Sequence, residues 1–146
     1  MGKKEKVIRK VVLDTNILVS SLLFQGDLAG IVGLWKTGRI IPVLSRATFA
    51  EFKAVLEYPK FSLSDQEIKL IIEQEVLPYF ETVDVSDETE SVCRDPDDDK
   101  FITCAVSASA EFIVSGDKDL LDIGEYRSVR IIDASTLLKI LNPRET

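Results

Sequence analysis

Four groups of acidic side chains are the part of this sequence best suited to chemistry. Asp14 directly follows an apolar run, and Glu51 lies in a stretch with helical periodicity. Asp117 follows a second apolar run, with Asp119 close behind, and the fourth group is the acidic run 95–99. Each group alone has an ordinary structural interpretation, as a turn residue, a helix cap or a solvated helix position.

The interpretation changes if folding brings the acids together. Converging carboxylates repel one another and raise each other's pKa unless a cation offsets them. Mg²⁺ and Mn²⁺ take oxygen ligands, and acidic sites that hold them support displacement at phosphorus. The 146 residues include no histidine, which excludes Ser-His-Asp and Cys-His catalysis and histidine-bound zinc. Hydrolytic chemistry would therefore rest on carboxylates, metal ions or lysine.

The predicted elements place several of these acids at the ends of strands. Short apolar, β-branched runs predict strands over residues 7–14, 40–44, 80–85, 112–115 and 129–132, the third of them at an edge. Strands that alternate with helices indicate a single α/β domain, residues 1–146, with a mainly parallel sheet. Ligands of such sheets bind at the carboxyl ends of the strands, where Asp14 and Asp117 lie.

Helices are predicted from apolar periodicity and from capping residues. Thr15 or Asn16 caps the first helix, Ser45 the third and Ser135 the last. Ser64, with a glutamate three residues later, forms a capping box for the fourth. The predicted helices cover residues 17–24, 28–36, 46–58, 64–77, 94–109 and 135–141.

Composition and charge limit the setting of this chemistry. The apolar stretches 17–24 and 101–106 are too short to span a membrane, and no signal peptide is recognised, so a cytoplasmic protein is expected. Cys93 and Cys104 are expected to be free thiols. The net charge of −7 is opposite to that of an electrostatic nucleic-acid binder. Bound cations and the basic residues within 3–10 would soften this difference.

Beyond the acids themselves, four segments of the sequence follow one another in a recognisable order. They are Val12-Leu13-Asp14-Thr15-Asn16, then Glu51-Phe52-Lys53-Ala54-Val55-Leu56 with Pro59-Lys60-Phe61, then Arg94-Asp95-Pro96-Asp97-Asp98, and finally Val114-Ser115-Gly116-Asp117-Lys118-Asp119-Leu120-Leu121. Together they resemble the PIN-domain family, in the branch of VapC-like toxins of toxin–antitoxin pairs. The likeness spans residues 7–141, and four motifs in order are far more specific than any one of them.

The resemblance implies a three-layer α/β/α sandwich with a central five-stranded parallel sheet. It also implies an endoribonuclease that depends on Mg²⁺ or Mn²⁺, with RNA as substrate, a cognate antitoxin as partner and a homodimer as assembly. The family's catalytic acids fall on Asp14, Glu51, Asp98 and Asp117. Asp98 is chosen within its run because the apolar positions behind it then fit a helix face, and Asp99 is the alternative.

The roles implied by the resemblance follow the same residues. Asp14 and Asp98, or Asp99, bind the metal directly, and Glu51 and Asp117 complete its surroundings. The implied reaction is hydrolysis without a covalent intermediate, leaving a 5′-phosphate and a 3′-hydroxyl. The supporting groups are Asn16, Ser115 and Asp119, the last of which assists or replaces Asp117.

Three other classes of protein share part of this pattern. A phosphatase of the haloacid-dehalogenase type also begins with an aspartate after its first strand, but it needs a second aspartate where Asn16 stands. A receiver-type phosphorylation switch would require a lysine after the last strand, where Asp133 is found. A non-catalytic RNA-binding module of the PIN fold is the third, and the complete set of four acids speaks against it.

Overall fold

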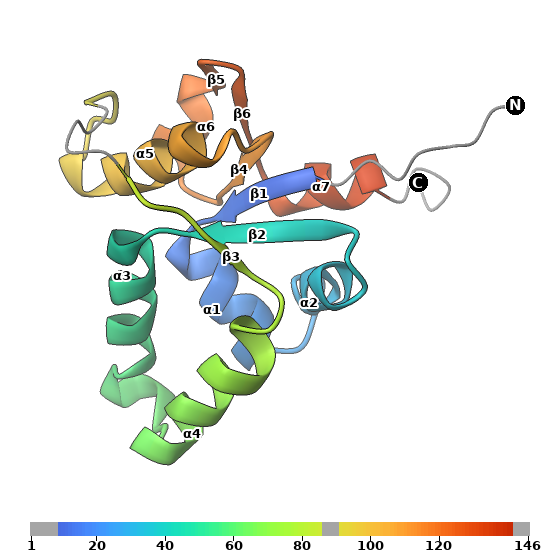
Figure 1. Ribbon diagram of the computed structural model, residues 1–146, viewed down its shortest axis with the longest axis vertical. Coiled ribbons are helices and arrows are strands. Elements are labelled where there is room, and N and C mark those ends of the chain that lie inside the picture. The colour runs from blue at the N-terminus through green and yellow to red at the C-terminus, as the bar shows by residue number, and fades with distance from the viewer. Residues whose placement is uncertain (1–8, 86–90, 142–146) are drawn as a thin grey trace, which may run out of the picture.

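The fold is a twisted sheet covered by helices on both faces (Figure 1). The computed structural model describes residues 9–85 and 91–141. The strands within these ranges are β1 Arg9–Leu13, β2 Ile40–Leu44, β3 Glu81–Thr82, β4 Phe112–Val114, β5 Glu125–Tyr126 and β6 Val129–Ile132. They lie in the order β3-β2-β1-β4-β6-β5. Neighbouring strands are parallel, except that β5 pairs antiparallel with β6.

Helices connect the strands and form the two outer layers. The α-helices are α1 Thr15–Leu23, α2 Ala29–Lys36, α3 Arg46–Leu56, α4 Asp65–Leu70, α5 Asp99–Ala108, α6 Lys118–Ile123 and α7 Ala134–Leu141. Pro59–Phe61 and Pro96–Asp98 form 3₁₀-helices, and Ile71–Val76 forms a π-helix that continues α4. Successive side chains of β1 point to opposite faces, so Val11 and Leu13 pack with α1, α2, α3 and α7 while Val12 packs with α5 and α6. This arrangement confirms the predicted three-layer sandwich.

The sheet has one strand more than the five predicted. The added strand, β5, forms a hairpin with β6 through Arg127 and Ser128, whose φ angles are 48° and 70°. Two consecutive left-handed residues are typical of the tight turn that suits twisted antiparallel strands, and Asn-Gly or Asp-Gly is its usual sequence signal. Arg-Ser carries no such signal, which is why the sequence predicted only the strand after the turn.

Two predicted helix caps were wrong for a common reason. Asp14, rather than Thr15 or Asn16, caps α1, since its Oδ1 accepts a hydrogen bond from the backbone N–H of Ile17 at 2.9 Å. Asp133, rather than Ser135, accepts from the backbone of Thr136 at 2.8 Å at the start of α7. In both places the chain enters the helix directly from the strand, so the first residue after the strand is the cap. The caps by Ser45 and Ser64 are confirmed.

Two helical predictions also differ from the structure. The short helix α6 was not predicted, because its six residues are too few to show a period. The predicted helix 64–77 changes from α to π after Leu70, and the backbone N–H of Leu77 bonds the carbonyl of Ile72 at 2.9 Å. The carbonyl of Glu75 meanwhile accepts from the buried Trp35 indole at 3.0 Å. Apolar periodicity does not distinguish such a widened turn from an α-helix.

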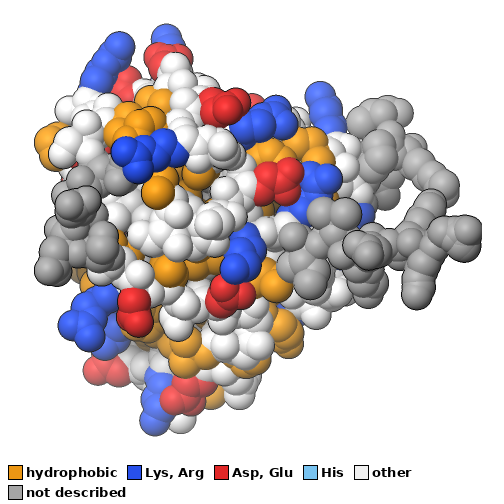
Figure 2. All heavy atoms as spheres, turned by 45° about the horizontal axis from the view of Figure 1, so that its top comes forward, with side chains coloured by type: hydrophobic (Ala, Val, Ile, Leu, Met, Phe, Trp, Pro, Cys, Tyr) orange, Lys and Arg blue, Asp and Glu red, His pale blue; other side chains and the backbone are white. Residues whose placement is uncertain are grey.

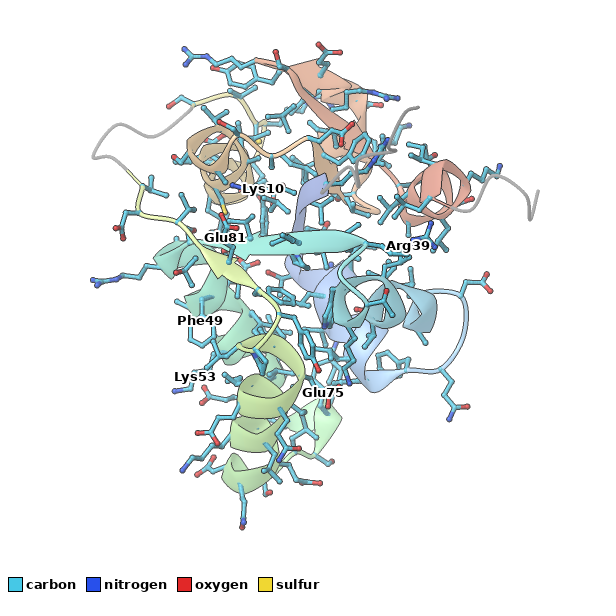
Figure 3. The ribbon with its side chains drawn as sticks, turned by 45° about the vertical axis from the view of Figure 1, so that its right-hand side comes forward. Lys10, Arg39, Phe49, Lys53, Glu75 and Glu81 are labelled. Carbon is cyan, nitrogen blue, oxygen red and sulfur yellow. The ribbon has the colours of Figure 1, made fainter. Side chains whose placement is uncertain are left out.

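Of the basic residues expected near the N-terminus, the two that the structure describes are each paired with an acid. Lys3, Lys4 and Lys6 lie outside the described residues, as does most of the acidic loop 84–90. Arg9 pairs with Glu111 at 3.4 Å, and Lys10 reaches across β2 to Glu81 at 3.0 Å (Figure 3). Basic and acidic side chains are also interspersed on the face shown in Figure 2. The mixed charges of the described residues on that face therefore do not form the basic surface that would bind a phosphate backbone.

Two smaller expectations concern membranes and thiols. No helix within residues 9–85 and 91–141 combines the length and the hydropathy needed to cross a membrane. Cys93 is half-buried and Cys104 is buried, and both are free thiols as expected.

Candidate active site

A cleft opens where the carboxyl ends of the central strands meet α1, α3 and the start of α5. Because β1 and β4 are parallel, with Leu13 paired to Val114, the residues that follow them lie next to each other. The cleft has a volume of ≈ 680 Å³. The carboxylates that line it, which we call the acidic end, are those of Asp14, Glu51, Asp98 and Asp117. The structure therefore brings together the four acids singled out in the sequence.

Asp14 is the most enclosed of these carboxylates, with a relative exposure of 6%. Its Oδ1 caps α1, and its Oδ2 accepts a hydrogen bond from the hydroxyl of Ser115 at 2.5 Å. Burial raises the pKa of Asp14 above its usual range, and the nearby charges of Asp117 and Glu51 add to this effect. The hydrogen bonds from Ser115 and Ile17 oppose it. A carboxylate in such surroundings favours a nearby positive charge.

Ser115 connects the two acids that follow the central strands. It is fully buried, and its hydroxyl oxygen accepts a hydrogen bond from the backbone N–H of Asp117 at 2.9 Å while donating to Asp14. Asp117 is exposed, and its Oδ1 caps α6 through the backbone N–H of Asp119 at 2.8 Å. Through one hydroxyl, Ser115 therefore links the carboxylate of Asp14 to the backbone of Asp117.

Glu51 is held by two groups that the sequence did not identify as part of the site. The hydroxyl of Thr15 donates to Glu51 Oε2, and Lys100 Nζ lies 2.5 Å from Glu51 Oε1 and 3.1 Å from Asp97 Oδ1. Burial alone would lower the pKa of Lys100, but its hydrogen bonds to Glu51 and Asp97 raise it. Lys100 is thus a fixed positive charge beside the acidic end. Its position three residues after Asp97, in the first turn of a helix, was the available sequence signal.

Within the run 95–99 the two candidate ligands have different surroundings. Asp98 lines the cleft, and burial together with the charge of Asp117 raises its pKa to about 6. Asp99 does not line the cleft, and its Oδ1 accepts hydrogen bonds from the backbone of Val92 and Cys93 at 3.0 and 2.8 Å. Although burial acts to raise it, these hydrogen bonds lower the pKa of Asp99. The geometry therefore favours Asp98 as the site residue, whereas Asp99 holds the segment that contains Val92 and Cys93 in place.

The remaining two predicted residues differ in the same way. Asn16 is exposed and lines the cleft. Asp119 lies outside the lining and pairs instead with Arg94 at 3.2 Å. Asn16 therefore lies in the cleft with the acids, whereas Asp119 is engaged by Arg94.

The cleft extends along α1 and α3 beyond the acids. Asp14 caps the beginning of α1 and Phe24 its end, about 15 Å away for ten residues at 1.5 Å each. Tyr58 likewise follows the end of α3, which carries Glu51. The residues that line this far part, which we call the aromatic end, include Phe24, Tyr58, Lys60 and Phe61. Pro59-Lys60-Phe61 belongs to the second of the four segments that resemble the PIN-domain family, and the resemblance implies no role for it.

The donor set of the acidic end fits a hard divalent cation. It consists of carboxylate oxygens, and the pKa of both Asp14 and Asp98 is raised, chiefly by burial and further by the charges of neighbouring carboxylates. Among the described residues, no three acidic, histidine or cysteine side chains are arranged to hold a metal ion by themselves. Mg²⁺ does not require such a cage, because it commonly binds through one or two carboxylates and keeps several waters.

Comparisons with known proteins agree with this architecture. The model of the PIN domain matches residues 10–119. An uncharacterized protein of Methanocaldococcus jannaschii is 31% identical over 150 residues, which cover 99% of this chain and 94% of that protein. Among solved structures, the PIN domain endonuclease Utp24 aligns with a TM-score of 0.54 and 17% identity, covering 86% of this chain and 84% of that one. FitAcB from Neisseria gonorrhoeae aligns with a TM-score of 0.47 and 17% identity, over 75% and 88% of the two chains.

The family match covers most of the chain, including the segments that carry Asp14, Glu51 and Asp98 and the strand that leads to Asp117. The relative from Methanocaldococcus jannaschii extends the similarity over nearly the whole length. This chain therefore belongs to the PIN-domain family, in which Utp24 is an endonuclease.

Proposed function

We propose that this protein is a metal-dependent endoribonuclease that hydrolyses RNA phosphodiesters at the acidic end of the cleft. The observation that carries the proposal is the convergence of Asp14, Glu51, Asp98 and Asp117 on one cleft at the carboxyl ends of β1 and β4. Carboxylates in this number, without histidine, suit Mg²⁺ or Mn²⁺ and phosphodiester chemistry.

The proposed division of labour follows the surroundings of each side chain. Asp14 and Asp98, the two acids with raised pKa, would hold the cation directly, and Glu51 and Asp117 would complete its surroundings. When bound, the cation would supply electrophilic stabilisation of the reacting phosphate and its leaving oxygen. Ser115 fixes the orientation of Asp14.

Both oxygens of Glu51 accept hydrogen bonds, one from Lys100 and the other from the hydroxyl of Thr15, so this carboxylate is held in one orientation. The lone pairs that remain on its oxygens would orient a water molecule beside the cation. Asn16 adds an exposed amide that can donate to a phosphate oxygen. The described groups can therefore orient both the attacking water and the RNA strand.

The test is cleavage of a labelled RNA of mixed sequence with Mg²⁺ or Mn²⁺, compared with the same reaction in excess chelator. We expect products with 5′-phosphate ends in metal and none in chelator. The control variant is Asp122→Asn, which removes an exposed acid of α6 that does not line the cleft. Phosphate release from small esters with intact RNA would favour the phosphatase hypothesis, and metal-independent RNA binding without cleavage would favour a non-catalytic module.

A toxin role belongs to the same proposal, with a cognate antitoxin as partner and a homodimer as assembly. Its support is the PIN-family resemblance of the motifs, and it is tested separately from catalysis. Light scattering of the purified chain would give a mass near twice 16.3 kDa for a homodimer. Expression in growing cells should arrest growth in the wild type and not in the Asp14→Asn variant.

A further inference from the structure

The aromatic end of the cleft leaves large apolar side chains uncovered. Phe24 is 54% exposed and Tyr58 is 50% exposed, and they are two of the four large hydrophobic side chains that are exposed in the described part of the chain. The other two, Leu70 and Leu77, do not line this cleft. Single exposed apolar residues are common, but two that share a cleft with a candidate active site indicate a surface that binds a ligand.

The aromatic end is fixed in place by the ends of two packed helices. Phe24 is the C-cap of α1, and its backbone N–H bonds the carbonyl of Ser20 at 3.1 Å. Tyr58 precedes and Phe61 ends a 3₁₀ turn that begins at Pro59, whose ring restricts the backbone. The rings of Phe24 and Phe61 lie 6.1 Å apart at an interplanar angle of 53°. The exposed faces are therefore presented by an ordered scaffold.

One positive charge accompanies these rings. Lys60 Nζ lies 5.1 Å from the centroid of the Phe61 ring, and it is the basic side chain among the described residues that line the cleft. The acidic end contributes four carboxylates to the same cleft. Long-range attraction of a polyanion is thus weak here, so a nucleic acid would have to gain its affinity from contacts that do not depend on net charge.

Stacking of bases on aromatic rings is such a contact. An unpaired base offers a flat face to an aromatic side chain. Each such stack adds binding free energy whatever the identity of the base. A basic residue beside the ring can at the same time contact a backbone phosphate. A paired base has both faces occupied by its neighbours and offers none to the protein.

We infer that Phe24, Tyr58 and Phe61 form a stacking subsite for an unpaired base of the RNA strand, with Lys60 contacting the adjacent backbone. The subsite lies at the opposite end of α1 from Asp14, so it would bind the RNA strand at a distance from the reacting phosphate. This inference rests on the proposed function, since it names how the same cleft holds its substrate.

The experiment measures binding of a fluorescent single-stranded RNA to the Asp14→Asn variant in Mg²⁺. Phe24→Ala and Tyr58→Ala should each weaken binding on the order of tenfold, the change expected for one lost stack. Tyr58→Phe should retain the affinity because it keeps the ring. Leu70→Ala, which shortens an exposed side chain outside the cleft, should leave the affinity unchanged.

A matched set of RNAs, each with one abasic nucleotide, locates the stacked base. One position should lose about tenfold in affinity with Tyr58 present and nothing further with Tyr58→Ala, which is the sign of a direct contact. Equal binding of all the RNAs, or of a duplex and a single strand, would overturn the subsite. A change in oligomeric mass without a change in RNA affinity would also overturn it and assign the rings to a protein partner.

The outcome for the subsite is separable from that for the proposed function. If the wild type cleaves RNA and the abasic series shows no preferred position, the function holds and the subsite fails. If the abasic series shows the stack but no metal supports cleavage, the subsite holds and the nuclease proposal fails. If single-stranded RNA does not bind, both fail.

Discussion

The two ends of the cleft are built in opposite ways. At the acidic end the side chains follow buried strands or lie on packed helices, and internal hydrogen bonds engage Asp14, Glu51 and Asp117. At the aromatic end the side chains follow the ends of helices, and Phe24 and Tyr58 stand half exposed. The acidic end gathers carboxylates around the buried Asp14, and the aromatic end leaves apolar side chains exposed to solvent.

Both arrangements are unfavourable for the free protein, and the RNA substrate proposed above would relieve each of them with a different part. Clustered carboxylates favour a cation and, through it, a phosphate. Uncovered rings favour a base. Under these proposals the chemical step and the binding of the base take place at opposite ends of the cleft along α1, so variants at the two ends should fail in distinguishable ways.

The largest expected effect is that of Asp14→Asn. Cleavage should fall on the order of 1000-fold, because a directly binding carboxylate is lost from the reaction site. The free energy of unfolding in chelator should stay equal or rise, since asparagine can still cap α1 and the repulsion from Asp117 and Glu51 is relieved. Urea unfolding and the cleavage assay check both. A large loss of stability would show that Asp14 is mainly structural.

Lys100→Met tests the internal charge that holds the acidic end together. Lys100 and Glu51 are both mostly buried, with side-chain exposures of 20% and 23%. Removing the ammonium leaves Glu51 without its strongest partner, so the free energy of unfolding in chelator should fall by about 1–3 kcal/mol. Lys53→Met, at an exposed position of α3 (Figure 3), is the control. Equal stability of the two variants would contradict this role.

Tyr58→Ala should separate the two ends in steady-state kinetics. Loss of an exposed ring should raise KM about tenfold and leave kcat within about twofold of the wild type, because the stack is made equally in the ground state and the transition state. Stability should change little at a half-exposed position. A fall in kcat with KM unchanged would instead connect Tyr58 to the chemical step and remove the distinction between the ends.

The smallest expected effect concerns the pH dependence of stability at Asp98. Its pKa in the folded protein is about 6 against an ordinary 3.8, chiefly because of burial and then the charge of Asp117. Protonated Asp98 therefore favours folding, and this contribution is complete below about pH 4 and is lost as the pH rises through 6. Asp98→Asn should exceed the wild type by roughly 1 kcal/mol at pH 7.5 and match it at pH 4.

Urea unfolding in chelator at the two pH values measures this difference, with Asp122→Asn as the matched acid-to-amide control. The control should show no such dependence because Asp122 is exposed. An Asp98→Asn variant that is less stable than the wild type at pH 7.5 would contradict the raised pKa.

Most of the fold could be predicted because it depends on strong local patterns. The strands β1, β2, β4 and β6 are short, mostly apolar and largely buried runs, and helices α1, α2, α3 and α5 have clear periods or caps. The misses fall where the local signal is short or ambiguous. β5 and α6 have two and six residues, and the π-helix after α4 differs from an α-helix by a single residue per turn.

Asp14 and Asp117 could be brought together from the sequence, since each follows a buried strand and the carboxyl ends of parallel strands meet at one edge of the sheet. Glu51 and Asp98 do not follow strands, and only the family resemblance pointed to them.

The choice between Asp98 and Asp99 could not be made from the sequence. Neighbouring helical residues point about 100° apart, so which of them faces the cleft depends on how α5 packs. The backbone N–H groups of Val92 and Cys93 donate to Asp99, while Asp98 lines the cleft, and this favours Asp98.

The partners of the acids and the second end of the cleft also belong to the tertiary structure alone. Lys100 contacts Glu51 across 49 positions of sequence, and Phe24 at the end of α1 contacts Phe61 in the 3₁₀-helix that follows α3. Residue types and local spacing determine which groups can carry charge or stack. Packing of distant segments determines which of them share a cleft, because such contacts depend on where helices cross and not on any repeat in the chain.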